Sequence, residues 1–521
     1  MNTHQHTKEQ LKTVTYKNPI LSGFHPDPSI CRVGDTYYLI TSTFEYFPGV
    51  PIFKSKNLVD WNQIGYCLTR PSQLKLNKTG SSGGIYAPTL RYHNNLFYMV
   101  TTNVSDRGNF YVTAEDPAGE WSDPIWVDQP GIDPDLFFDE DGSVYFTTSY
   151  GGDGAYQSRI DIHTGERLTD YKRIWTGTGG QYPEAPHMYK IGDYYYLMIA
   201  EGGTEYGHMV TIARSKQPEG PYESCPGNPI LTHRSQSYFI QATGHADFVQ
   251  TEHGDWWAVF LGIRPIGYPR SHHLGRETYL APVTWNEQGW PVIGDQGTVS
   301  EEMSTNRLPG GYAPKAVSSN ETIRDDFDTP ELSLSWNFLR NPYSQDWSLT
   351  EKPGSLTLRG SAVTLNDVDS PAFVGQRQRH FDCSVSALLE FNPENEGEEA
   401  GLTIRANEKF HYEIAILNDG GQRKLIQRRR IGSLWKVEHE QEWNQDRVIL
   451  SIQADEKTYK FGYAKESNPS VTTLIGEGEC AFLGTEVAGG FTGVYFAMYA
   501  TGNGKKAQSP AHFEWFEYKF I

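Results

Sequence analysis

Three carboxylates and a histidine stand at matching places in a segment that recurs along the chain. Asp27, Asp133 and His245 each open one copy of the segment, and Glu184 lies one residue before the start of another. If the copies surround a common axis, these four side chains meet in one narrow site. Crowded carboxylates repel one another and raise the pKa of some members, and such clusters are usually kept for function. The pattern predicts acid–base catalysis, with a metal site made of the same residues as the alternative.

Carboxyl groups of different pKa, placed on either side of a sugar, carry out glycoside hydrolysis. One is ionised and activates water, while the other stays protonated and donates to the leaving oxygen. The composition agrees with a sugar substrate, because 31 Tyr and 13 Trp offer ring faces for stacking, although core packing explains much of this content. The net charge of −19 disfavours nucleic acids and anionic lipids. We therefore expect a neutral oligosaccharide as partner, with no nucleic acid and no membrane.

Five segments share one plan, in which a turn leads into a short strand, a polar turn and an aromatic-rich strand. They are Asp27–Phe44, Ala87–Asn103, Asp133–Tyr150, Ala185–Gly203 and His245–Gly262. Their starts are 60, 46, 52 and 60 residues apart, about the length of a four-stranded propeller blade with its loops. The repeat predicts a five-bladed β-propeller, in which equivalent positions lie at equal radius and height. An array of β-sandwiches is the alternative.

The rest of the chain divides by composition. Residues 1–17 read as an N-terminal tail, residues 18–304 as the catalytic propeller, and residues 305–323, rich in Pro, Gly, Ser and Asn, as a linker. From residue 324 to 521 the strands alternate without helical periodicity, which indicates a concanavalin-like or jelly-roll β-sandwich. The fold class is therefore all-β, with a propeller followed by a sandwich.

The compartment is predicted from two features. Residues 1–12 are polar and do not resemble a signal peptide, and no stretch approaches the length of an apolar membrane span. The five cysteines are scattered, odd in number and without a CxxC pair, which favours free thiols in a reducing compartment. We expect a cytoplasmic protein.

Eight motifs of the chain together carry a resemblance to a known family. The ordered motifs NPILSGFHPDPSI, STFEYFPGVPI, GGIYAPTL, GIDPDLFF, YPEAPHMYK, AEGG, TGHADF and LGRET resemble glycoside hydrolase family 43. They extend from about residue 18 to residue 293, and the second half of the chain resembles the domain appended to the two-domain β-xylosidases and α-L-arabinofuranosidases of that family. The resemblance implies a five-bladed propeller and hydrolysis with inversion at the anomeric carbon.

The resemblance also implies roles by motif. Asp27 would be the general base that deprotonates water, and Glu184 the general acid. Asp133 would orient the acid and raise its pKa. His245 would lie near the pore centre, where it holds water or a cation or orders the carboxylates. Arg276 would reach a sugar hydroxyl or the base. Without the resemblance, His245 is interpreted as a packed histidine and Arg276 as a surface arginine.

An aromatic wall is predicted beside the carboxylates. Phe44 and Tyr86 lie at the same end of the blades and would form this wall, or would simply be core residues. Many xylosidases of the family carry Trp at the position of Tyr86, so the choice of pentose stays open. In the sandwich, residues 489–495 resemble a loop that reaches over the active site, and Phe491 would close the pocket. A closed pocket favours exo action.

No cofactor is required for this chemistry. A cation near His245 is possible, and a structural calcium is conceivable at Asp325, Asp326 and Asp328, although such a cluster is more often a solvated turn. No metal residue is assigned.

Four hypotheses follow. The first is an exo-acting, inverting glycosidase that releases terminal β-D-xylose or α-L-arabinofuranose from xylan-, arabinoxylan- or other arabinose-bearing oligosaccharides. The second is an endo-arabinanase, and the third a non-catalytic carbohydrate-binding propeller, which leaves the shared carboxylates unexplained. The fourth is a propeller scaffold for protein partners. The chain is also a possible homo-oligomer, although nothing in the sequence specifies an interface.

Overall fold

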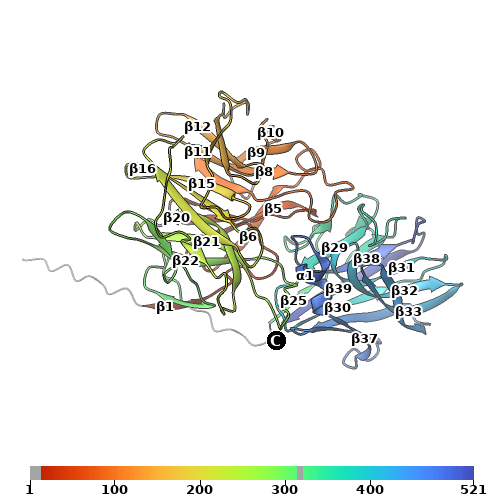
Figure 1. Ribbon diagram of the computed structural model, residues 1–521. Helices are drawn as coiled ribbons and strands as arrows, with labels where there is room; N and C mark the ends of the chain where they lie inside the picture. The colour runs from red at the N-terminus through yellow and green to blue at the C-terminus, as the bar shows by residue number, and fades with distance from the viewer. Residues whose placement is uncertain (1–12, 314–320, 521) are drawn as a thin grey trace, which may run out of the picture.

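The computed structural model describes residues 13–313 and 321–520, which form two all-β units side by side (Figure 1). The first unit holds five antiparallel sheets in which the strands follow chain order. The first two sheets are β2 (Ser29–Val33), β3 (Thr36–Ile40), β5 (Gly49–Ser55), β6 (Asn62–Leu68), then β7 (Thr89–His93), β8 (Leu96–Asn103), β9 (Gly108–Ala114), β10 (Ile125–Trp126). The third is β11 (Ile132–Phe138), β12 (Val144–Ser149), β13 (Ala155–Arg159), β14 (Lys172–Trp175).

The last two sheets complete the set. The fourth is β15 (Glu184–Ile191), β16 (Tyr194–Glu201), β17 (Met209–Ser215), β18 (Glu223–Ser224), with β19 (Leu231–Thr232) also on β17. The fifth is β20 (Gln241–Gln250), β21 (Trp256–Ile263), β22 (Glu277–Trp285), β23 (Pro291–Ile293). The innermost strands β2, β7, β11, β15 and β20 contact one another in turn, and β20 returns to β2. This closed ring confirms the five-bladed propeller, and the sandwich array is wrong.

The predicted boundaries need correction at three ends. Val14–Lys17, placed in the tail, forms β1 and pairs with β24 (Glu302–Thr305), where Tyr16 is buried. Thr305 and residues 321–323, placed in the linker, belong to strands, because β25 (Glu321–Asp325) pairs with β39. Strands this short leave too little periodicity to be seen in the sequence. The remainder of the predicted tail, residues 1–12, and linker residues 314–320 lie outside the described residues.

The second unit is a sandwich of two antiparallel sheets, as predicted. One sheet has the order β27 (Trp347–Ser348), β28 (Leu356–Arg359), β39 (Pro510–Phe520), β30 (Cys383–Glu390), β35 (Arg447–Ala454), β36 (Thr458–Ala464), β37 (Thr473–Glu479). The other has the order β29 (Ala372–Arg377), β38 (Tyr495–Thr501), β31 (Glu399–Asn407), β32 (Phe410–Asp419), β33 (Gln422–Ile431), β34 (Leu434–Glu442). Leu402, Leu450 and Phe496 are fully buried in its core.

The two units are joined by main chain and by apolar packing. β4 (Tyr46–Phe47) of the propeller pairs with β26 (Phe338–Leu339) of the sandwich. The rings of Tyr46 and Tyr495 stack across the junction at 3.8 Å. One buried apolar cluster extends from the first two blades into the sandwich. This junction allows a loop of the sandwich to keep a fixed place over the propeller.

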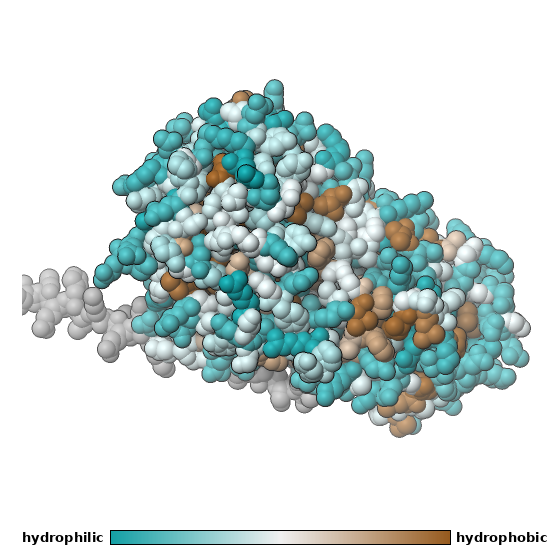
Figure 2. Space-filling view, in the orientation of Figure 1, coloured by the Kyte–Doolittle hydropathy of each residue, from teal (hydrophilic) through white to brown (hydrophobic). Residues whose placement is uncertain are grey.

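Helix is scarce in the described residues. The turn η1 (Cys480–Leu483) and the short helix α1 (Thr485–Ala488) lie just before the loop of residues 489–493. None of the described helices has the length and apolarity needed to cross a membrane. The face shown in Figure 2 is mostly hydrophilic, with separate hydrophobic groups over the sandwich, in keeping with the acidic composition.

Candidate active site

Four of the five aligned repeat positions share an unusual backbone conformation. Asp27, Asp133, Ala185 and His245 have φ angles of 54°, 53°, 51° and 51°. This left-handed region is sparsely occupied by residues other than glycine, and strain of this kind gathers at functional sites. In blades three to five, the pairing register shifts between Ile132 and Asp135 and over the equivalent residues, so each inner strand is bulged at its start. The bulges turn the side chains at these positions toward the axis.

All eight residues predicted for the site line one cavity of about 530 Å³. They come from every blade and from the sandwich: Asp27, Phe44, Tyr86, Asp133, Glu184, His245, Arg276 and Phe491. Nine further residues line the cavity that were not singled out from the sequence, namely Ala87, Ile132, Tyr182, Gly203, Thr204, Glu205, Thr485, Gly489 and Gly490. Most of these lie within two residues of a motif quoted above, and this proximity is the one signal that pointed to them.

Asp27 is buried and held from two sides. Its Oδ2 accepts a hydrogen bond from Ser42 Oγ at 2.5 Å, and its Oδ1 forms an ion pair with Arg276 Nη1. Arg276 is only 5% exposed, so the alternative interpretation of this residue as a surface arginine is wrong. An arginine on one oxygen and a hydroxyl on the other fix the direction of the Asp27 carboxylate.

The other two carboxyl groups carry raised pKa values. Burial, followed by the charge of Asp27, raises the pKa of Glu184 to about 7, while Arg276 acts in the opposite direction. Burial, followed by the charges of Glu184 and Asp27, raises the pKa of Asp133 well above its usual range. Asp133 Oδ2 also accepts a hydrogen bond from the N–H of Ala185 at 3.2 Å, next to Glu184 in the chain. Burial and the charge of Asp27 thus raise the pKa of Glu184, and Asp133 contacts the strand that carries Glu184.

His245 is neutral at ordinary pH. Burial lowers its pKa to about 3, against the opposing effect of Asp27. Its Nδ1 lies 3.7 Å from Asp27 Oδ1, which is too long for a hydrogen bond. The histidine therefore adds a polar but uncharged wall beside the base.

An aromatic group lines the same cavity as the carboxylates. The ring centroids of Phe44, Tyr86 and Phe491 are 5.2–6.3 Å apart. The guanidinium carbon of Arg276 lies 5.3 Å from the ring centre of Phe44 and 5.8 Å from that of Phe491. Rings at these distances make one apolar surface with a cation at its edge.

The sandwich loop that carries Phe491 is fastened to the propeller. The N–H of Phe491 donates to Ser82 Oγ at 2.8 Å, and its carbonyl accepts from Arg276 Nη2 at 3.2 Å. Gly493 allows close contact, because a Cβ there would lie 2.2 Å from the carbonyl oxygen of Leu274. The arginine that holds Asp27 therefore also holds the loop that covers the pocket.

A second charged cluster lies two residues further along the same inner strands. Arg91 donates to Asp135 Oδ1 at 2.7 Å and to Asp247 Oδ2 at 2.9 Å, and its Nη2 is 3.0 Å from His187 Nδ1. Ser29 Oγ of the first blade also donates to Asp247. Arg91 of the second blade thus contacts the third, fourth and fifth blades beneath the site, and the first blade joins the cluster through Ser29 and Asp247.

Glu201 supports the loop that leads to the acid. It is fully buried and accepts hydrogen bonds from the N–H groups of Thr178 and Gly180 and from the Thr211 hydroxyl at 2.5–3.0 Å. A Cβ on Gly177 or Gly180 would lie within 2.8 Å of Glu201, so glycine is required there. This residue was quoted only as part of the AEGG motif, and its supporting role depends on contacts that the sequence does not show.

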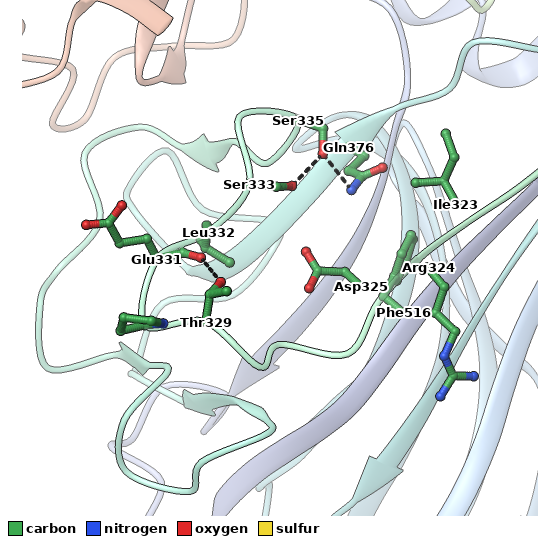
Figure 3. Close-up of a pocket in the computed structure, with 11 residues that line it drawn as sticks. Ile323, Arg324, Asp325, Thr329, Glu331, Leu332, Ser333, Ser335, Gln376 and Phe516 are labelled. Atoms are coloured by element: carbon green, nitrogen blue, oxygen red, sulfur yellow. Dashed lines mark hydrogen bonds between the residues drawn. The ribbon is translucent and has the colours of Figure 1, made fainter. Parts of the chain in front are cut away.

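The predicted cation sites receive no support. Among residues 13–313 and 321–520, no group of three or more His, Cys, Asp or Glu side chains is arranged to hold a metal ion. Asp325 instead accepts from the N–H of Phe327 and from Trp336 Nε1, and Asp326 pairs with Arg324. Asp325 and Glu331 both line a cavity of about 640 Å³ in the sandwich. Figure 3 shows the carboxylate of Glu331 directed away from that of Asp325.

Acid–base cleavage of a glycosidic bond is the chemistry that a fixed carboxylate and a carboxyl group of raised pKa support, and the protein is a glycosidase. It belongs to a family described as glycosyl hydrolases family 43, which matches residues 16–291, and residues 324–519 match the "Beta xylosidase C-terminal Concanavalin A-like domain". These matches confirm the resemblance seen in the motifs.

Relatives extend over the whole chain. It is 47% identical over 517 residues to a "Non-reducing end alpha-L-arabinofuranosidase" of Bacteroides ovatus, covering 98% of this chain and 96% of the relative. It is 37% identical to a "Xylosidase/arabinosidase" of Butyrivibrio fibrisolvens, covering 96% and 99%. A solved structure described as "Bacteroides ovatus Xyloglucan PUL GH43B" superposes with a TM-score of 0.92 at 46% identity, covering 98% of this chain and 100% of that one.

Proposed function

We propose that the protein is an exo-acting, inverting glycosidase that removes a terminal pentose, α-L-arabinofuranose ahead of β-D-xylose, from oligosaccharides. In the proposed reaction, Asp27 takes a proton from water, and the water oxygen forms a bond to the anomeric carbon. Glu184 gives its proton to the glycosidic oxygen as the bond to the leaving sugar breaks. A pKa of about 7 keeps Glu184 protonated at the start of each cycle.

The single observation that carries the proposal is the enclosure of the carboxylates. Asp27 and Glu184 lie in a cavity lined by all five blades and covered by the sandwich loop at Phe491. A polysaccharide that runs through the site requires a groove open at both ends, whereas this cavity suits a chain end. The enclosure favours exo action over the endo-arabinanase alternative, and the raised pKa of Glu184 favours catalysis over sugar binding alone.

The sugar is proposed from relatives and from the wall of the pocket. The 47% identical relative is named an arabinofuranosidase, which supports arabinose as first choice. Other relatives, such as a "Beta-xylosidase" of Bacillus subtilis at 33% identity, support xylose as the second candidate. Tyr86 is half-buried in the wall and brings a hydroxyl to the site. A hydroxyl selects among pentoses by the sugar oxygens that it can reach.

The deciding experiment compares kcat/KM on 4-nitrophenyl α-L-arabinofuranoside and 4-nitrophenyl β-D-xylopyranoside. We expect the arabinoside to be preferred and the Glu184→Gln variant to lose activity on oligosaccharides. Proton NMR of the first-formed sugar is expected to show the inverted anomer. Retention of configuration would overturn the roles of Asp27 and Glu184, and absence of turnover on both substrates would overturn the pentosidase proposal.

We place this reaction in the cytoplasm, acting on oligosaccharides small enough to be imported. The five cysteines are free, and four of them are buried, which suits a reducing compartment. Cell fractionation with an antibody against the chain tests the location, and recovery outside the cytoplasmic fraction would contradict it.

A further inference from the structure

Two exposed tyrosines stand at the rim of the cavity. Tyr182 lines the cavity and is 54% exposed, and Tyr150 is 43% exposed at the end of β12. Large aromatic side chains left in water at the edge of a binding site commonly mark contact surface. Neither residue has a part in the proton transfers described above.

A hydrogen bond brings together the two segments that carry these tyrosines. Ser149 Oγ donates a hydrogen bond to the carbonyl of Pro183, so the residues that flank this bond are Tyr150 on one segment and Tyr182 on the other. Ser149 also pairs with Ile132, which lines the cavity. Tyr150 therefore lies one residue from contacts with two segments that line the mouth of the pocket.

The aromatic surface extends from Tyr150 over the outer part of the third blade. The rings of Tyr150, Tyr156 and Tyr171 form a mutual cluster with centroids 5.6–6.3 Å apart. Arg167 lies over Tyr171 at 5.2 Å. On the pocket side, the ring of Tyr182 packs against Gly203, where a Cβ would lie 3.0 Å from Cδ2. The tyrosines are thus held in place by their neighbours, which lowers the entropy lost when a ligand binds.

We propose that Tyr182 and the Tyr150 cluster form a binding track for the sugars on the leaving-group side of the scissile bond. The proposal rests on the proposed function and adds that the substrate is an oligosaccharide rather than a disaccharide. The C–H faces of pyranose rings pack on the aromatic rings, while hydroxyls reach polar groups at the rim, Glu205 beside the pocket and Asp153 beside Tyr156. Tyrosine suits this task because its ring is apolar and its hydroxyl remains wet.

The test measures how kcat/KM depends on substrate length. Substrates are 4-nitrophenyl pentoside and xylo- or arabino-oligosaccharides of two to five units, in the pentose that the wild-type protein prefers. We expect kcat/KM to rise with length in the wild-type protein and to rise less in Tyr150→Ala, with a loss of about 3- to 10-fold on the longest substrate relative to the aryl pentoside. Tyr150→Trp keeps the stacking surface and is expected to restore the dependence on length.

The matched control is Trp435→Ala, which removes an aromatic side chain of similar exposure, 48%, from β34 of the sandwich. This variant is expected to keep the wild-type dependence on length. An equal loss on aryl and long substrates in Tyr150→Ala, or a wild-type kcat/KM that does not change with length, would overturn the track.

Calorimetry separates this proposal from the proposed function. Xylotetraose and arabinotetraose are titrated into the Glu184→Gln protein with and without Tyr150→Ala. Weaker binding of either sugar in the double variant supports the track even where the wild-type protein hydrolyses no pentoside, and equal binding of both sugars refutes it. A protein partner on this surface predicts the same equal binding and therefore also counts against the track.

Discussion

Two charged clusters share the propeller axis, two residues apart on the same strands, and they differ in how their charges are balanced. In the lower cluster, Arg91 lies between Asp135 and Asp247. Burial opposes ionisation of Asp247, but Arg91 and the hydrogen bonds from Ser29 and Tyr189 outweigh it and hold its pKa well below the usual range. Asp247 is therefore ionised, and the lower cluster is closed on itself by the contacts of Arg91.

The upper cluster holds more acid than it can neutralise. Asp27, Asp133 and Glu184 share Arg276 as the basic residue that acts on all three, and burial and mutual repulsion raise the pKa of Asp133 and Glu184. A carboxyl group that stays protonated near neutral pH is a proton donor, whereas a paired carboxylate is not. The same strands therefore supply a buried ion-pair cluster at one level and reactive carboxyl groups at the next. The ratio of arginine to carboxylate decides between the two.

The largest effect is expected where the upper cluster loses its base. Asp27→Asn keeps the size of the side chain and removes the proton acceptor, so kcat is expected to fall by about 10²–10⁴-fold. The melting temperature is expected to hold within a few degrees, since a polar group still faces Ser42. Steady-state kinetics on an oligosaccharide and thermal unfolding check both parts, and a variant with wild-type kcat would remove Asp27 from the mechanism.

The lower cluster is expected to respond in stability. Arg91→Met leaves Asp135 and Asp247 buried without their cation, which typically costs about 3–5 kcal/mol of unfolding free energy. Arg70→Met is the matched control, because Arg70 pairs with the exposed acids Glu120 and Asp123, and such pairs contribute about 0–1 kcal/mol. Urea unfolding measures both variants, and equal losses would contradict the contrast between buried and exposed pairs.

The pH dependence tests the raised pKa of Glu184. Since the acid must be protonated, kcat/KM on an oligosaccharide is expected to fall about tenfold per pH unit above a pH of about 7. A 4-nitrophenyl leaving group needs little proton donation, so its alkaline decline is expected to be weaker. Rates from pH 4 to 9 with both substrates give the comparison; the same decline with both would point to a group other than Glu184.

The smallest effect is a gain in the free energy of unfolding when the carboxyl group of Glu184 is removed. Folded Glu184 keeps its proton up to about pH 7, whereas an unfolded glutamate releases it at about pH 4.3. Between these values the folded state binds more protons, so this residue makes stability fall as pH rises. Glu184→Gln removes the loss and is expected to be more stable by on the order of 1–2 kcal/mol at pH 8 and about equal at pH 4. Unfolding curves at the two pH values check the difference, and a variant destabilised at both would refute it.

Much of the fold could be predicted from the sequence because it depends on local patterns of turns and strands. The five aligned segments predicted five blades, and the inner strands close a ring of five. The alignment of Asp27, Asp133, Ala185 and His245 corresponds to one repeated left-handed backbone conformation. The role of Arg91 was not predicted, because a lone arginine on a strand carries no sign of the three other blades that it will contact. The pairing of β4 with β26 was also missed, since two-residue strands have no period.

The sequence by itself determined the two all-β units, the family and the residues whose chemistry matters, because repeated turns, alternation and acid types are properties of short segments. Only the tertiary structure decided which carboxyl groups are protonated, because their pKa values depend on burial and on the positions of Arg276 and Arg91, which come from other blades. It also decided which propeller group holds Phe491, the residue that the resemblance placed over the pocket, because its N–H donates to Ser82, more than 400 residues away in the chain. Contacts between residues this far apart arise when the blades close and the sandwich docks, and no local pattern records them.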